Sequence, residues 1–168
     1  GSVSLQVAAP AGGVTITLTS SDPGKVVLAA YNANSVGSVS VNVTIPAGSS
    51  SGNFDLQALD SSGAVQITAT ATGYASATGT VNLAPSGFAL LGGDVNTTTL
   101  AANTAVPVYF VRLTPGTLNY ASTANLRPGV SAQVGLSSSN TTVGTIIGSP
   151  VSWPTRANSN SGMAFDPL

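Results

Sequence analysis

The chain has 168 residues, with only four basic and five acidic side chains and with neither Cys nor His. This near-neutral charge excludes the basic clusters that nucleic acids or anionic membranes require, and no apolar run reaches the roughly 20 residues that span a bilayer. Because all five acids are Asp, the sequence also lacks the His, Cys or Glu sets of catalytic triads, zinc sites and glutamate pairs.

Four stretches alternate strictly between aliphatic and polar residues, beginning with the Val-Thr-Ile-Thr-Leu-Thr run at 14–19. Such a period of two predicts half-buried strands. Turn sequences such as Pro-Ala-Gly and Ser-Ser-Asp-Pro-Gly separate the stretches. We expect an all-β chain of antiparallel sandwich type. The predicted inward residues are Val14, Ile16, Leu18, Val39, Val41, Val43, Ile45, Val65, Ile67, Ala69, Ala71, Val81 and Leu83.

An internal repeat divides the chain. Residues 18–28 (LTSSDPGKVVL) match residues 136–146 (LSSSNTTVGTI), and residues 43–56 match residues 151–168. The repeat predicts two domains, 1–86 and 87–168, joined near the Pro- and Gly-containing stretch 82–93.

The two copies differ at their ends. Only a short segment precedes the first copy, and the second copy stops where the first continues into two more strands. We therefore expect the second domain to lack its last strands. They would be supplied in trans by a neighbour, or by residues downstream of this chain.

The turn and strand motifs resemble a known family. The runs PAGGVTITLTSSDPGKVVL, VTIPAGSSSGNFDL and VQITATATGYASATGTVNL are similar to the Ig-like repeats of large bacterial surface and adhesin proteins. The run LRPGVSAQVGLSSSNTTVGTI is similar to a neighbouring repeat of this kind. The resemblance implies two tandem Ig-like sandwiches in an extracellular stalk, filament or spacer, with no catalytic residues to carry over.

The charged residues predict turns rather than sites. We expect Lys25 to lie in a solvated turn, which leaves neither a Ser-Lys pair nor a Lys–Asn isopeptide bond. Asp60 or Asp94 could each offer one carboxylate to Ca²⁺, but the sequence contains no D-x-D-x-D run. We therefore predict no catalytic, cofactor-binding or metal-binding residues and no cofactor.

Three further features are candidate surface sites. Threonines alternate on the strands at 15–19 and 68–72, where they form solvent-facing rows or, on a flat sheet, an ice-binding array. Asn42, Asn96 and Asn140 head N-x-S/T sequons and are glycosylation candidates. The aromatic residues could form a sugar platform, but their scattering favours core positions or interface contacts. A core position is favoured above all for Trp153, which aligns with Ile45. These aromatics are Tyr31, Tyr74, Tyr109, Phe110, Tyr120 and Trp153.

The predicted function is that of a non-enzymatic structural module. It would act at the cell surface as a stalk spacer, or as a filament subunit joined head-to-tail to neighbouring repeats or copies of itself by strand complementation. The alternative is an adhesin module that binds a glycan or a host protein. Neither prediction includes nucleic acid binding or membrane insertion.

Overall fold

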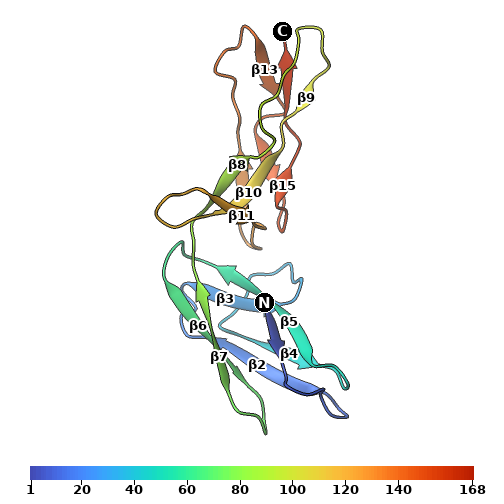
Figure 1. The fold of residues 1–168 in the computed structure, drawn as a ribbon, viewed down its shortest axis with the longest axis vertical. Coiled ribbons are helices and arrows are strands. Elements are labelled where there is room, and N and C mark those ends of the chain that lie inside the picture. Colours follow the sequence, from blue (N-terminus) through green and yellow to red (C-terminus); the bar gives the residue numbers. More distant parts are fainter. The chain divides into compact units, whose positions relative to one another are not determined.

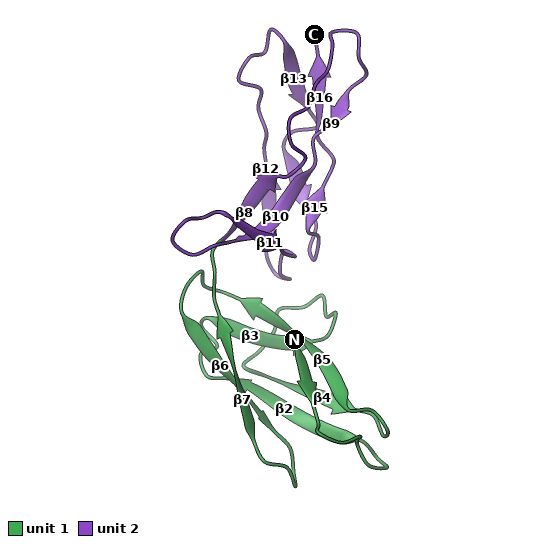
Figure 2. Cartoon of the chain, viewed as in Figure 1, with its two compact units in different colours: residues 1–85 green, residues 86–168 purple.

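The computed structural model describes all 168 residues, and it confirms an all-β chain of several antiparallel sheets, consistent with a β-sandwich. The chain divides into two compact units, residues 1–85 (unit 1) and residues 86–168 (unit 2), coloured separately in Figure 2. It contains no helix that could cross a membrane.

Unit 1 has seven strands in two antiparallel sheets (Figure 1). One sheet has the order β1-β5-β3 and the other the order β4-β2-β6-β7. The strands are β1 (Ser2–Ser4), β2 (Val14–Ser20), β3 (Val26–Ala30), β4 (Ser40–Ile45), β5 (Ser51–Ala58), β6 (Ala64–Thr70) and β7 (Ala77–Asn82).

The alternation of the sequence sets the two faces of the four-stranded sheet. Val14, Ile16 and Leu18 on β2 are buried, whereas Thr15 and Thr19 are exposed. The same rule buries Val65 and Ile67 on β6. The inward prediction is wrong for Val39, which precedes β4 and is 47% exposed. The inward residues of both sheets form one core. This core fixes the strand register, because a shift of one residue would turn every aliphatic side chain toward solvent. The buried members of this core are Ala9, Val14, Ile16, Leu18, Val26, Leu28, Val43, Ile45, Phe54, Val65, Ile67 and Leu83.

Unit 2 has nine short strands. β10 is flanked by β8 and, on separate stretches, by β11 and β15; β12 pairs β14; and the third sheet has the order β13-β16-β9. The strands are β8 (Ser86–Leu90), β9 (Thr104–Ala105), β10 (Val108–Leu113), β11 (Tyr120–Thr123), β12 (Ala132–Val134), β13 (Gly144–Ile147), β14 (Val151–Trp153), β15 (Ser159–Asn160) and β16 (Ala164–Pro167).

The core of unit 2 is smaller and more aromatic. Trp153 is 4% exposed, as expected for a core position, and its indole Nε1 donates a hydrogen bond to the Ala157 carbonyl oxygen at 3.1 Å. The ring of Phe88 lies 4.9 Å from the Trp153 ring and 5.5 Å from that of Phe110. The buried members of the cluster are Val108, Leu126, Val134, Trp153 and Met163.

Two strand pairs of unit 2 have the same order along the chain as two pairs of unit 1. β12 pairs β14 as β2 pairs β4, and β13 pairs β16 as β3 pairs β5. The third strand also corresponds, because β9 lies on the free side of β16 and β1 on the free side of β5. Two of the three sheets in unit 2 therefore repeat pairings found in unit 1.

The pairing fixes a register that the sequence letters do not give. Leu28 is opposite Leu56, and at the matching position Ile146 is opposite Phe165. Phe165 therefore corresponds to Leu56. Alignment of the Phe-Asp pair in each copy would instead have matched Phe165 with Phe54. The place of Phe54 falls to Met163, which is fully buried.

The turn after β2 also has a counterpart. The Asp22 side chain accepts a hydrogen bond from the Gly24 N–H at 3.1 Å, and the Asn140 side chain accepts one from the Thr142 N–H at 3.1 Å. Both are short polar side chains that bond to backbone two residues ahead and so fix a turn.

Candidate functional site

The outer edge of the β12–β14 pair is the first candidate interaction surface. β2 in unit 1 has two neighbours, β4 and β6, whereas β12 pairs with β14 alone. An edge strand presents unpaired N–H and C=O groups that can accept another strand. We call residues 132–138, which comprise β12 and the four residues after it, the β12 edge.

Side chains along the β12 edge alternate, with one face turned inward. Val134 is buried, Ala132 and Leu136 are half-buried, and Gln133 and Gly135 are exposed. In unit 1 the residue that matches Leu136 is Leu18, which is 2% exposed. The β12 edge therefore carries inward-facing aliphatic side chains that are less covered than their counterparts in unit 1.

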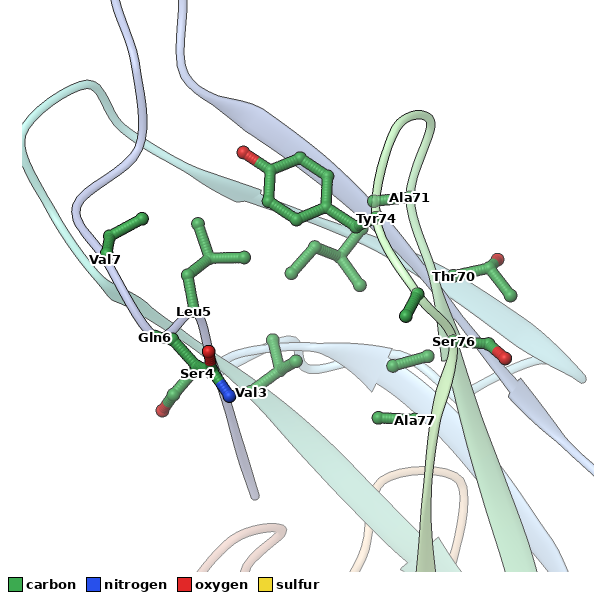
Figure 3. A pocket seen from close by; sticks show the side chains of 13 residues that line it. Val3, Ser4, Leu5, Gln6, Val7, Thr70, Ala71, Tyr74, Ser76 and Ala77 are labelled. Atoms are coloured by element: carbon green, nitrogen blue, oxygen red, sulfur yellow. The ribbon is translucent and has the colours of Figure 1, made fainter.

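A cavity of about 500 Å³ in unit 1 is the second candidate. It lies between the N-terminal segment and the end of the β6–β7 hairpin, as Figure 3 shows. Val3 and Leu5 reach in from one side, and Ala71, Tyr74 and Ala77 line the other (Figure 3).

The lining of the cavity limits its chemistry. The polar side chains around it belong to Ser4, Gln6, Thr70, Tyr74 and Ser76, and no carboxylate, Lys or Arg is among the lining residues. Such a surface can take up an apolar group and orient it with a hydroxyl or amide. It offers no general base or metal ligand set.

The outward face of the four-stranded sheet in unit 1 is a third polar surface. Cross-strand partners there include Thr15 with Thr44 and Thr19 with Thr68. The Thr17 hydroxyl donates a hydrogen bond to the Asn42 side-chain oxygen at 2.9 Å. The Thr15 and Thr44 hydroxyls also lie 3.4 Å apart, so two of these cross-strand pairs are joined by side-chain hydrogen bonds.

The Asp residues do not gather into one site in the structure. The Asp60 carboxylate accepts a hydrogen bond from the Ser61 N–H at 2.6 Å, and that of Asp55 accepts one from the Asn32 N–H at 3.0 Å. No group of three carboxylate, His or Cys side chains is close enough to hold a metal ion. Asp94 lies outside the strands, and Lys25 lies in the turn before β3.

The sequons and aromatics do not meet in one place either. Asn42, Asn96 and Asn140 are all exposed, on β4, in a loop and in a turn, respectively. Of the aromatics, Tyr31 and Tyr120 are exposed on different units, and Tyr74 lines the cavity.

Two features were missed by sequence reasoning. The Phe88 ring packs on Trp153, and the N-terminal residues Val3 and Leu5 form one wall of the cavity. A signal is present for the second feature, since the Val-Ser-Leu run at 3–5 alternates like a short strand, whereas the Phe-Ala-Leu run at 88–90 is apolar throughout.

Comparison with protein family models, with curated proteins and with solved structures finds no match to this chain. Its function is therefore inferred from its own surfaces and strand pairing.

Proposed function

We propose that this chain is a non-enzymatic structural module: two tandem Ig-like sandwiches of an extracellular, cell-surface repeat protein. It acts as a stalk spacer or as a filament subunit that joins its neighbours by strand complementation. The second sandwich lacks the counterparts of β6 and β7. Neighbouring repeats or further copies of the chain are its partners.

The strand pairing shared by the two units is the observation that carries this proposal. β2–β4 and β3–β5 in unit 1 correspond to β12–β14 and β13–β16 in unit 2. A repeated sandwich makes each unit an interchangeable length of a longer array, which is how repeat proteins build extended structures. Low charge and a Ser-, Thr- and Asn-rich surface favour close packing between such modules.

Force extension of single molecules tests the spacer role. The full chain is held between two handles and pulled. We expect two separate unfolding steps, one for each unit, because each has its own core. A single unfolding step for all 168 residues would contradict the tandem organisation.

Sedimentation over a wide range of protein concentration, with negative-stain images at both extremes, tests the filament role. A filament subunit forms longer particles as the concentration rises, because head-to-tail contacts do not close. A monomer at every concentration argues against self-assembly and leaves the spacer role alone.

The cavity in unit 1 favours one alternative, an adhesin module that binds a glycan or a host protein. Its partly exposed Tyr74 ring and apolar walls could stack against a sugar face. Screening the full chain on a glycan array, beside the variant Tyr74→Ala, tests it. Binding that the variant loses would support the adhesin role, and an array without signal would argue against glycan binding.

A further inference from the structure

We infer that the β12 edge is an acceptor site for a β-hairpin of the β6–β7 type, brought by a second polypeptide segment. This inference rests on the proposed function and commits to one of its two kinds of partner, because the hairpin would come from a neighbouring repeat and not from a second copy of this chain. The template is unit 1 itself, where β6 occupies the matching side of β2.

Backbone direction identifies the groups that receive the hairpin. In unit 1 the Ser20 N–H donates to the Val39 carbonyl oxygen on the β4 side, whereas the Ser21 N–H donates to the Gln66 carbonyl oxygen on β6. Successive residues of an extended strand point to opposite sides. The backbone N–H and C=O groups of odd-numbered residues in this stretch therefore point toward β6, and those of even-numbered residues point toward β4.

Unit 2 follows the same alternation 118 positions later, the offset that separates Leu18 from Leu136. The Leu136 N–H donates to the Ser149 hydroxyl at 2.9 Å, and the same hydroxyl donates back to the Leu136 carbonyl oxygen at 2.9 Å. Leu136 thus faces the β14 side. The N–H groups of Gly135 and Ser137 then face the open side, and neither donates a hydrogen bond in the structure.

The register of unit 1 predicts which residues meet. Thr70 lies opposite Thr17 and Thr68 lies opposite Thr19. A bound hairpin would therefore place the residue equivalent to Thr70 beside Gly135 and the one equivalent to Thr68 beside Ser137. The inward side chain equivalent to Ala69 would lie opposite the half-buried Leu136, and the one equivalent to Ile67 would lie opposite Ser138.

The occupant is a supplied hairpin and not a strand taken from a second copy of this chain. The β6 strand of each copy is already buried within unit 1, where Val65 is 2% exposed and Ile67 is 7% exposed. Donating it would uncover one core in order to cover another. A segment of the same pattern from outside residues 1–168 carries no such penalty.

A synthetic peptide of residues 64–83, which spans the β6–β7 hairpin, is the probe. It is added to the full chain, and amide hydrogen exchange is read by mass spectrometry. We expect saturable protection centred on residues 135–137. Protection confined to unit 1, or no protection, would overturn the inference.

Two peptide controls test the mode of binding without altering the protein. A peptide with Ile67→Asp places a charge on the inward face. A peptide methylated on the Thr68 backbone nitrogen lacks one N–H that would donate a hydrogen bond to the β12 edge. We expect each altered peptide to bind at least about tenfold more weakly than the unaltered peptide. A tenfold loss of affinity corresponds to about one hydrogen bond between neutral groups or one aliphatic contact. Equal binding by both peptides would show adsorption and overturn the inference.

Matched protein variants test whether the peptide binds at the β12 edge. Ser137→Pro removes the outward N–H, whereas Ser137→Ala keeps it. We expect the first to lose about tenfold in peptide affinity and the second to bind normally. Fluorescence of the single Trp153, in the core of unit 2, reports whether each variant is folded. Should Ser137→Pro fail to fold, the methylated peptide decides.

Self-pairing is a separate outcome. Protection of residues 135–137 that rises with protein concentration in the absence of peptide would assign the edge to a second copy and overturn the supplied hairpin. Two unfolding steps under force combined with no peptide binding would leave the structural role standing without this acceptor site. Peptide binding combined with a single unfolding step would support the acceptor site and contradict the tandem structural role.

Discussion

The two units build their central strand pair in the same way but finish it differently. In unit 1, β2 is held between β4 and β6, and the core contains twelve buried hydrophobic side chains. In unit 2, β12 is held on one side only, and the core contains five. Three of the unit 1 residues, Val65, Ile67 and Leu83, lie on or just beyond the β6–β7 hairpin, for which unit 2 has no counterpart.

Unit 2 has a cluster of aromatic rings beside its short strands. β8 pairs β10 and places Phe88 opposite Phe110 in the register, and the Phe88 ring also packs on Trp153. Large rings cover more area per residue than Val or Ile. Phe88 stays 42% exposed and Phe110 is half-buried, so Trp153, at 4% exposed, is the one fully buried ring of the three.

Replacement of Trp153 by Ala should have the largest effect. Truncating a buried Trp costs about 3–5 kcal/mol, which is a large part of the 5–15 kcal/mol that stabilises a typical domain. We expect unit 2 to unfold and unit 1 to remain folded. Hydrogen exchange resolved by peptide measures both units in one sample.

Trp153→Phe is the matched control, because it keeps an aromatic ring beside Phe88. It should retain most of the protection in unit 2. If Trp153→Ala left the exchange of unit 2 unchanged, the aromatic cluster would not be its structural centre.

Ile67→Ala tests the contribution of β6 to unit 1. The side chain is 7% exposed, and such a truncation costs about 2–5 kcal/mol. We expect a lower denaturant midpoint for unit 1, followed by circular dichroism, with no change in the Trp153 fluorescence transition of unit 2. Gln66→Ala on the same strand, whose side chain is exposed, should leave both midpoints in place. Equal effects from the two substitutions would mean that β6 does not act through its inward face.

The fold could be predicted from the sequence where alternation is long and uninterrupted. The runs at 14–19 and 65–71 gave the correct inward residues for β2 and β6, because each has a buried and a solvated face. The core position of Trp153 followed from its alignment with Ile45, and both are buried.

The rest depends on contacts between distant residues. Phe165 takes the place of Leu56 because the strand pairing sets an offset of 109 residues between the two copies here, whereas the Phe-Asp letters suggest 111. Phe88 meets Phe110 and Trp153 where β8 pairs β10 antiparallel across a 17-residue connection. The cavity forms where residues 3–7 pass the β6–β7 turn, and no local pattern encodes that passage.

A buried amide supplies a smaller contrast between the units. Gln57 is 3% exposed; its oxygen accepts a hydrogen bond from the Gly37 N–H at 3.0 Å, and its nitrogen donates one to the Ser35 carbonyl oxygen at 3.0 Å. Gln57→Ala leaves both backbone groups without these bonds and should destabilise unit 1 by about 1–3 kcal/mol. Gln133 in unit 2 is exposed, so Gln133→Ala should change the stability of its unit by less than about 0.5 kcal/mol. Chemical denaturation of the two variants compares them, and similar losses would show that the Gln57 bonds to residues 35–37 contribute little.

The smallest effects should come from the paired turns, where the comparison is closest. Asp22→Ala removes the acceptor for the Gly24 N–H, and Asn140→Ala removes the acceptor for the N–H and hydroxyl of Thr142. These groups are exposed, so water replaces part of each lost bond, and each substitution should cost about 0.5–1.5 kcal/mol in its own unit alone. Urea midpoints read by Trp153 fluorescence for unit 2, and by circular dichroism for unit 1, measure the two losses. Similar losses are expected because the two side chains bond their backbones in the same pattern, 118 positions apart, despite the charge on Asp22. A loss confined to Asp22→Ala would mean that charge, and not the shared turn geometry, stabilises this connection.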